Sequence, residues 1–208
     1  MTSGFIVAGT DTGIGKTVFC AALTRALGFN YWKPVQAGTQ EETDTQVVQR
    51  LSGLPADHFL EPRYSLRTPC SPHLAAEIDK VQIERSQLGL PETVRPVVVE
   101  LAGGLLVPLT RDLLQIDVIG DWALPIILCA RTSLGTINHT LLSIDVLKTR
   151  GLNIHGITFI GEENIDTERT ICDFAMTRRL GRLPLLASLD AVTLHAAFDA
   201  HFRREVFQ

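Results

Sequence analysis

The stretch GTDTGIGKT, residues 9–17, follows a short apolar run and precedes a helical pattern. Strand, glycine-rich loop and helix, in that order, are the context of a phosphate-binding loop. The general pattern G-x-x-x-x-G-K-[ST] would place its first glycine at position 10, but this chain has Thr10 there and carries Gly9 instead. Thr10 can fill that place if its backbone dihedral angles are ordinary. We therefore interpret the stretch as a phosphate-binding loop rather than a chance glycine-rich turn.

The residue types in the loop suit phosphate chemistry. Small residues let backbone N–H groups approach phosphate oxygens, and the N-terminus of the following helix adds partial positive charge. Lys16 can reach the outer phosphates, and the hydroxyl of Thr17 can ligate Mg²⁺. Kinases, GTPases, partition ATPases and ATP-driven ligases all use such a loop, so the loop alone does not name a reaction.

Apolar, strand-sized runs alternate with helical patterns along the 208 residues. This alternation predicts an α/β fold of the P-loop NTPase type, with a mostly parallel sheet flanked by helices on both faces and with residues 1–208 forming a single domain. The expected strands are 4–9, 31–35, 96–101, 125–130 and 154–160. The expected helices are 16–27, 43–51 with Thr43 as its cap, one within 82–88, 136–149, 165–179 and 193–204.

Composition and charge narrow the possible partners and the cellular location. A net charge of −4 without a dense basic run gives no case for nucleic acid, and the apolar runs are too short for a membrane span. The four cysteines form no C-x-x-C pair, and no secretory signal is visible at the N-terminus. We therefore expect reduced, packed cysteines, no zinc site and a cytoplasmic protein.

Three charged residues downstream are candidates for the same site. Lys33 ends a predicted strand, and the carboxyl edge of an open α/β sheet is where ligands bind; a solvated surface lysine is the alternative. Asp44 lies in the first turn of a predicted helix, where it either complements the helix dipole or reaches a metal. Glu100 ends the buried run VVVE, and an unpaired buried carboxylate is costly, which favours a role in completing Mg²⁺ coordination.

Taken in order, six features resemble the dethiobiotin synthetase family. They are GTDTGIGKT, KPVQAG from Lys33, an aspartate soon after, SPH at 71–73, VELAGG at 99–104 and LGTINH at 134–139. The resemblance covers residues 9 to about 151. It implies an ATP- and Mg²⁺-dependent ligase that closes a ureido ring on 7,8-diaminopelargonic acid with CO2. The carbamate of one amine attacks the γ-phosphate, and the second amine then expels phosphate from the mixed anhydride, giving dethiobiotin, ADP and phosphate.

The resemblance also implies roles for individual residues and a homodimer. Lys16 and Lys33 would be catalytic, flanking the carbamate and the γ-phosphate, and Thr17, Asp44 and Glu100 would ligate Mg²⁺. The implied ATP-binding residues are Thr12, Gly13, Ile14, Gly15, Lys16, Thr17, Val18, Asp44, Glu100, Gly103 and Leu185. The implied substrate-binding residues are Ala37, Thr39, Ser71, Gly135 and Asn138. The segment 134–139 would hold the substrate's carboxylate from the partner chain, or it is an ordinary helix start.

The chain departs from the family pattern at three places. Ala37 stands where the family has Ser or Thr, and Thr39 is the candidate to take over that contact. Leu101 replaces a glycine, so we expect metal binding to be kept and the packing near the nucleotide to change. Ile160 or Gly161 stands where many members carry an asparagine that reads adenine. We therefore expect either a weaker specificity for adenine or adenine recognition by the backbone around residues 183–186.

Three other functions compete with the ligase. A partition or regulatory ATPase would release phosphate whether or not the diamine is present. The amide-forming synthetases of cobyrinic acid biosynthesis carry a glutaminase domain, for which this chain is too short. A nucleotide-binding interaction module is disfavoured, because such a module has no need for Lys33 and Glu100 to flank one site.

Overall fold

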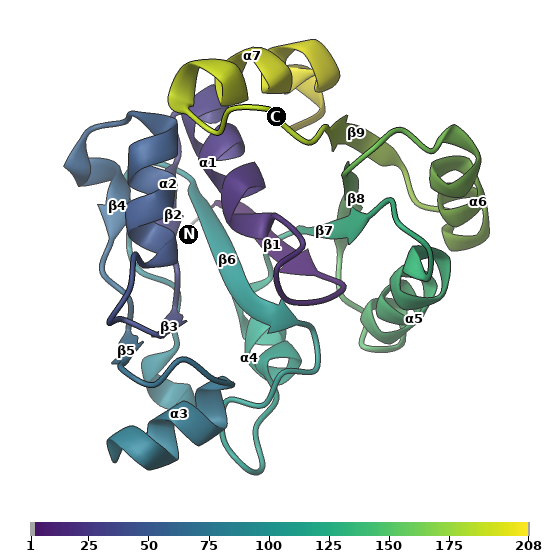
Figure 1. The fold of residues 1–208 in the computed structure, drawn as a ribbon. Coiled ribbons are helices and arrows are strands. Elements are labelled where there is room, and N and C mark those ends of the chain that lie inside the picture. Colours follow the sequence, from purple (N-terminus) through teal and green to yellow (C-terminus); the bar gives the residue numbers. More distant parts are fainter. Residues whose placement is uncertain (1–2, 208) are drawn as a thin grey trace.

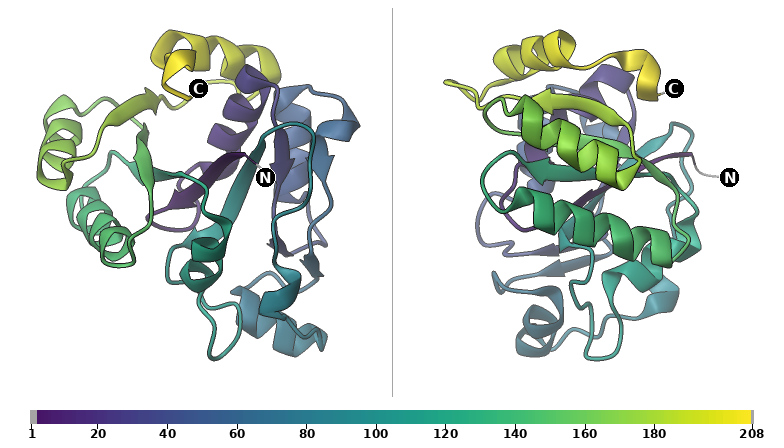
Figure 2. Two further views of the ribbon diagram at one scale, coloured as in Figure 1. Left: turned by 180° about the vertical axis from the view of Figure 1, so that it is seen from behind. Right: turned by 90° about the vertical axis from the view of Figure 1, so that its right-hand side faces the viewer.

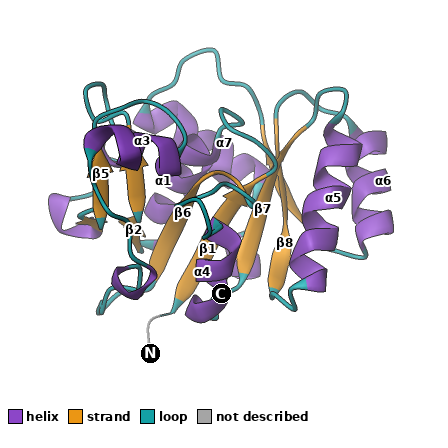
Figure 3. Cartoon of the chain, turned by 90° about the horizontal axis from the view of Figure 1, so that it is seen from below, coloured by secondary structure: helices purple, strands orange, loops and turns teal. Residues whose placement is uncertain are grey.

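A parallel sheet forms the centre of the computed structural model, which describes residues 3–207 (Figure 1). Its strands are β1 (Gly4–Gly9), β2 (Asn30–Trp32), β4 (Phe59–Leu60), β6 (Val97–Gly104), β7 (Ile126–Arg131), β8 (Ile154–Ile160) and β9 (Arg179–Leu183). Within these residues the order across the seven-stranded sheet is β4-β2-β6-β1-β7-β8-β9, and each neighbouring pair is parallel. Figure 3 shows β2, β6, β1, β7 and β8 side by side in this order. All carboxyl ends therefore meet at one edge of the sheet.

Helices cover both faces of the sheet. On one face lie α1 (Lys16–Leu27), α2 (Asp44–Ser52) and α7 (Ala191–His201); on the other lie α4 (Gln115–Trp122), α5 (Thr136–Thr149) and α6 (Ile165–Ala175). Strand β1 supplies both cores, since Phe5 and Val7 pack with the first group and Ile6 and Ala8 with the second. Figure 2 shows α5 and α6 side by side. The predicted α/β class with helices on both faces is confirmed.

A smaller parallel pair extends the molecule beyond the carboxyl edge. It consists of β3 (Val35–Ala37) and β5 (Tyr64–Leu66), and helix α3 (Pro72–Asp79) follows it, below β6 in the view of Figure 1. Pro34 separates β3 from β2, because proline has no backbone N–H to continue the ladder. This small unit places the chain around Ala37 and Ser71 next to the phosphate loop.

The sequence predicted some elements correctly and missed others. The segments 4–9, 16–27, 136–149 and 154–160 have the predicted bounds, whereas the expected strand 31–35 is broken in two at Pro34. The helix expected within 82–88 is wrong: only a short 3₁₀ turn, Arg85–Gln87, is found there, and the helix of that region is α3. The expected helix 165–179 ends at Ala175, because Met176 adopts a left-handed conformation with φ 45° and leaves Arg179 free to begin β9.

None of the helices within residues 3–207 combines the length and the apolar character needed to span a bilayer.

The start of α2 gives a test of the local structure. Thr43 Oγ1 accepts from the Gln46 N–H at 3.3 Å, and Gln46 Oε1 accepts from the Thr43 N–H at 2.8 Å. Thr43→Ala removes the first of these bonds and should lower the free energy of unfolding by about 1 kcal/mol. Urea unfolding followed by circular dichroism measures the change. Thr43→Ser keeps the hydroxyl and should stay near the wild type; equal losses in both variants would contradict the capping role.

Candidate active site

A cavity of about 490 Å³ opens at the carboxyl edge of the sheet, beside the phosphate loop. Segments far apart in the sequence meet there, namely the loop, the end of β2, β3, the starts of α1, α2 and α3, and the end of β6. The cavity is lined by Thr12, Gly13, Gly15, Lys16, Thr17, Lys33, Val35, Gln36, Ala37, Asp44, Pro69, Cys70, Ser71, Pro72, Glu100, Ala102, Gly103 and Val107.

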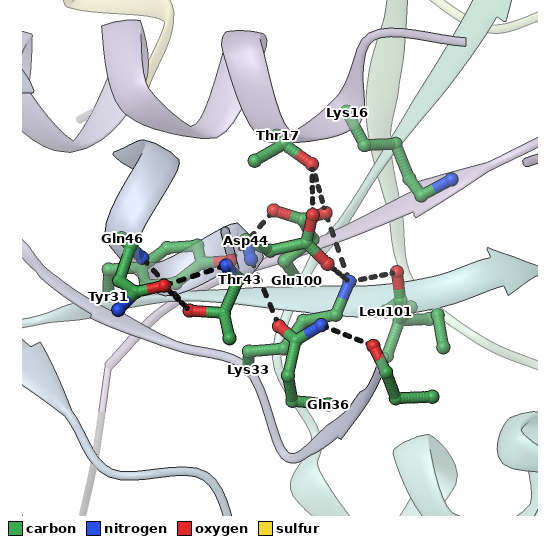
Figure 4. Close-up of polar contacts among 12 residues, drawn as sticks. Lys16, Thr17, Tyr31, Lys33, Gln36, Thr43, Asp44, Gln46, Glu100 and Leu101 are labelled. Carbon is green, nitrogen blue, oxygen red and sulfur yellow. Dashed lines mark hydrogen bonds and ion pairs between the residues drawn. The ribbon is translucent and has the colours of Figure 1, made fainter. Parts of the chain in front are cut away.

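Four side chains that line this cavity, three of them charged, form a charged cluster (Figure 4). Lys33 Nζ lies 2.8 Å from Asp44 Oδ2 and 3.1 Å from Glu100 Oε1. The Thr17 hydroxyl lies 3.0 Å from Asp44 Oδ1 and 2.8 Å from Glu100 Oε1, so it can donate to either carboxylate. Lys33, Asp44, Glu100 and Thr17, which the sequence singled out separately, are therefore in direct contact.

The fold explains why these residues meet. Trp32 of β2 pairs with Val99 of β6, so the residues that follow each of them, Lys33 and Glu100, emerge side by side at the carboxyl edge. Glu100 also pairs with Val7 of β1, whose continuation is the phosphate loop. Asp44 is the first residue of α2 and faces the same point because the capping box fixes the start of that helix.

Burial and charge act in opposite directions on the ionisable groups. Burial alone would lower the pKa of Lys33, but the negative charges of Glu100 and Asp44 outweigh it, and the pKa is raised above its ordinary value. Burial would raise the pKa of Asp44, yet the ammonium of Lys33 lowers it. The pKa of Lys16 is lowered by burial and then by the charge of Lys33. At neutral pH, Lys33 is thus a fixed cation held against an ionised Asp44.

Two further residues, which contact this cluster, were missed by the sequence interpretation. The hydroxyl of Tyr31 donates to Glu100 Oε2 at 2.9 Å, and burial, followed by the charge of Glu100, raises the pKa of Tyr31 well above its ordinary value. Gln36 Oε1 accepts from the Asp44 N–H at 3.1 Å. A tyrosine in an apolar run is indistinguishable from a core residue, but its spacing of two from Lys33 places both on one side of a strand.

The phosphate loop explains the displaced glycine. Lys16 Nζ donates to the carbonyl of Asp11 at 2.8 Å, which folds the lysine back over the loop. A Cβ at position 9 would lie 2.7 Å from Lys16 Nζ, 2.8 Å from Lys16 Cδ and 2.9 Å from Ile14 Cδ1, so any other residue there would displace these side chains. Thr10 is not among the residues with positive φ, so its backbone is ordinary, as the variant spacing requires.

Of the predicted site residues, those that line the cavity are Thr12, Gly13, Gly15, Lys16, Thr17, Lys33, Ala37, Asp44, Ser71, Glu100 and Gly103. Those that do not are Ile14, Val18, Thr39, Gly135, Asn138 and Leu185. Gly135 and Asn138 lie at the exposed start of α5, and Leu185 is exposed after β9. Thr39 donates its backbone N–H to the Leu66 carbonyl at 3.1 Å.

The departures from the family pattern have visible structural consequences. Leu101 is buried in the core, and its carbonyl accepts from Lys33 Nζ at 3.4 Å. Ile160 packs against the phosphate loop, since a Cβ at Gly15 would lie 3.0 Å from Ile160 Cγ2. An apolar side chain therefore occupies the position at the end of β8 where the resemblance suggested an asparagine.

The oxygen atoms of Asp44, Glu100 and Thr17 suit a hard cation that is also coordinated by the phosphates of a nucleotide. Within residues 3–207, no group of three or more His, Cys, Asp or Glu side chains is placed to hold a metal by itself. Asp44, Glu100 and Thr17 nevertheless supply two carboxylates and a hydroxyl at one point, where the Lys33 ammonium bridges the carboxylates. Mg²⁺ is usually bound by one or two carboxylates together with phosphate oxygens and waters, so these residues fit it.

These features define a P-loop nucleotide-binding protein: a strand, a glycine-rich loop ending in Gly15-Lys16-Thr17, a helix, and the charged cluster beside the loop. A family model described as an AAA domain matches residues 3–193. Among solved structures, a ParA family ATPase from Chlorobium tepidum TLS is similar with a TM-score of 0.56 at 10% identity, covering 96% of this chain and 92% of that one. This likeness concerns the fold alone.

Curated relatives are similar over the full length of the chain. The ATP-dependent dethiobiotin synthetase of Rhodopseudomonas palustris (strain TIE-1) is 59% identical over 207 residues, which span 100% of this chain and 98% of that protein. The enzyme of the same name from Novosphingobium aromaticivorans is 54% identical over 205 residues, 99% of each chain. The chain belongs to the dethiobiotin synthetase family.

The steric role of Gly9 can be tested by Gly9→Ala. The added methyl group would displace the Lys16 side chain from the loop, and overpacking of this kind costs about 1–3 kcal/mol. We expect affinity for a non-hydrolysable ATP analogue, measured by isothermal titration calorimetry, to fall by roughly tenfold or more. Gly89→Ala is the control, because a Cβ there meets no atom within 4 Å. Wild-type affinity in a folded Gly9→Ala protein would refute the explanation.

Proposed function

We propose that the chain is an ATP-dependent ligase that converts 7,8-diaminopelargonic acid and CO2 to dethiobiotin. The similarity to curated dethiobiotin synthetases supports this proposal. The structural observation that supports it most is that two lysines, Lys16 and Lys33, line the same cavity as Thr17, Asp44 and Glu100. Two cations and two carboxylates around one cavity suit the joining of an anionic carbamate to a highly charged nucleotide.

The proposed reaction has three steps. CO2 adds to one substrate amine and gives a carbamate with release of a proton. A carbamate oxygen then attacks the γ-phosphorus, the bond to the bridging oxygen breaks, and ADP leaves. The second amine attacks the carbonyl carbon of the resulting carbamic–phosphoric anhydride, the C–O bond to phosphate breaks, and the ureido ring closes with release of phosphate and a proton.

The two lysines neutralise the charge that these steps bring together. A carbamate is a weak nucleophile and is repelled by the nucleotide, so catalysis depends on holding the two close in a cationic setting. Lys33 is supported for this role because its charge is secured by Asp44 and Glu100. Lys16 is supported because its short bond to the Asp11 carbonyl can be exchanged for a phosphate oxygen. Nothing in these steps calls for a paired His and carboxylate.

The side chains of Thr17, Asp44 and Glu100 would hold Mg²⁺ in the working enzyme. When bound there, the ion would neutralise phosphate charge. Lys33 bridges both carboxylates. In the proposed working state it gives up part of that contact and turns to the carbamate and the γ-phosphate.

The proposal also covers the residues that would contact ATP and the cytoplasmic location of the enzyme. Thr12, Gly13, Gly15 and Gly103 would lie along the phosphates, while Ile14 and Val18 would support the loop from the helix side. Leu185, which is exposed after β9, would contact the base. A net charge of −4 supports the absence of a nucleic acid partner, and unpaired cysteines are consistent with a cytoplasmic enzyme.

The substrate is proposed to lie between two copies of the chain. Ala37 and Ser71 line the cavity and would contact the diamine, with Thr39 nearby in sequence. Gly135 and Asn138 would act from the partner chain, where the start of α5 offers backbone N–H groups to the substrate's carboxylate. Exposed apolar residues on this side support a homodimer, since Leu134 is fully exposed and Leu106 and Leu142 are 51% and 57% exposed.

The ligase predicts phosphate release that requires every substrate. A phosphate-release assay with Mg·ATP, bicarbonate and 7,8-diaminopelargonate, with each omitted in turn, should show turnover only in the complete mixture. The rival partition-type ATPase, whose fold this chain shares, would release phosphate without the diamine. Turnover that ignores omission of the diamine would therefore exclude the ligase in favour of that rival.

The same assay checks the role of Lys33. Lys33→Gln should reduce the rate by roughly 100-fold or more, the usual cost of losing one group that stabilises transition-state charge. Lys80→Gln, which alters an exposed lysine outside the cavity, is the matched control. Full activity in a folded Lys33→Gln protein would show that the assignment is wrong.

A further inference from the structure

The hydroxyl of Tyr31 contacts the charged cluster but does not reach the cavity. The side chain is fully buried, and Tyr31 is absent from the residues that line the cavity. Its hydroxyl donates to Glu100 Oε2 at 2.9 Å, on the side of the carboxylate turned away from Thr17 and Lys33 (Figure 4). Any effect of Tyr31 on the chemistry must therefore pass through Glu100.

The two oxygens of Glu100 have different partners. Oε1 receives the Thr17 hydroxyl at 2.8 Å and the Lys33 ammonium at 3.1 Å, and both of those residues line the cavity. Oε2 receives the Tyr31 hydroxyl. A partial rotation of the carboxylate about its final bond would break the Tyr31 bond, so this bond fixes the plane of the carboxylate. In that plane one oxygen of Glu100 faces Thr17 and Lys33 at the cavity.

Tyr31 itself is held firmly. It lies in β2, where it pairs with Val98 of β6, the strand that carries Glu100. Its ring packs against Phe59 with centroids 6.5 Å apart and belongs to the core cluster that includes Phe19. Donor and acceptor therefore come from neighbouring strands of one sheet, which keeps the direction of the hydrogen bond constant when ligands bind.

We propose that Tyr31 is a positioning residue that orients the Glu100 carboxylate for Mg²⁺ and so sets the Mg²⁺ requirement for nucleotide binding. The inference rests on the proposed function and its Mg²⁺ site. Hydrogen bonds to a ligating carboxylate orient it, and loss of such a partner costs about 10–100-fold in metal affinity or activity. Tyr31→Phe removes this bond and leaves the ring in place.

The test measures binding rather than turnover. Titration calorimetry with the non-hydrolysable analogue AMP-PCP at a series of Mg²⁺ concentrations gives the concentration that supports half-maximal binding. Tyr31→Phe should raise that concentration by roughly 10–100-fold. The affinity reached at saturating Mg²⁺ should stay close to that of the wild type. A purely structural role would lower the melting temperature and leave the Mg²⁺ dependence unchanged.

The chain supplies a matched control, because it contains only two tyrosines. The Tyr64 hydroxyl accepts from the Glu84 N–H at 2.9 Å and lies outside the cavity, so Tyr64→Phe should keep the wild-type Mg²⁺ dependence. Wild-type binding that is independent of Mg²⁺ would overturn the metal site itself. A Mg²⁺ dependence that is present in the wild type and unchanged in Tyr31→Phe would overturn the role of Tyr31 alone.

Fluorine NMR keeps the inference testable if Tyr31→Phe does not fold. Replacement of both tyrosines by 3-fluorotyrosine gives two resonances, and Tyr64→Phe assigns them. Addition of Mg²⁺ to the protein in the presence of excess AMP-PCP should shift the Tyr31 resonance and leave that of Tyr64 in place. A Tyr31 resonance that does not respond to Mg²⁺ would overturn the inference.

Discussion

The contacts of the Glu100 carboxylate with Lys33, Thr17 and Tyr31 are the constraint on which the site depends. Glu100 is only 1% exposed, and a charge buried to that degree costs several kcal/mol if it is unpaired. It is paired because β2 and β6 are neighbouring parallel strands whose register brings Lys33 beside it. Buried ion pairs often stabilise a fold no better than apolar residues would, so this cluster is evidence of function more than of stability.

The phosphate loop is shaped by the lysine that it must accommodate. Position 9 is a glycine, and a Cβ there would collide with the Lys16 side chain. Gly13 and Gly15 adopt positive φ values of 66° and 97°. Lys16 is held by a backbone carbonyl and Lys33 by two carboxylates, so both ammonium groups are fixed at the cavity where the nucleotide would bind. Charged groups held in a site need less reorganisation than water would when negative charge develops.

The sequence predicted those parts of the site where the hydrophobic pattern and the type of residue indicate the same role. The sequence singled out Lys16 from the glycine-rich loop between strand and helix, and Lys33 and Glu100 from their places at the ends of apolar runs. The structure brings all three to one cavity. Helix α3 was missed because its region is rich in proline and polar residues, which hide the start signal of Ser71 followed by Pro72 at the first helical position. Tyr31 was missed because a donor pointing at a buried carboxylate becomes visible only once strand pairing is known. Gln36 was missed for the same reason, since its partner is the first N–H of α2.

The fold is shared with ATPases of other function, so the fate of the γ-phosphate distinguishes the proposed chemistry most directly. The test uses ¹⁸O-labelled bicarbonate in ordinary water, with Mg·ATP and 7,8-diaminopelargonate, at times shorter than the exchange of CO2 oxygen with solvent. Transfer to the carbamate predicts that each released phosphate carries a single ¹⁸O atom, because the attacking oxygen leaves with phosphorus when the ring closes. Phosphate whose added oxygen comes only from water would contradict the account.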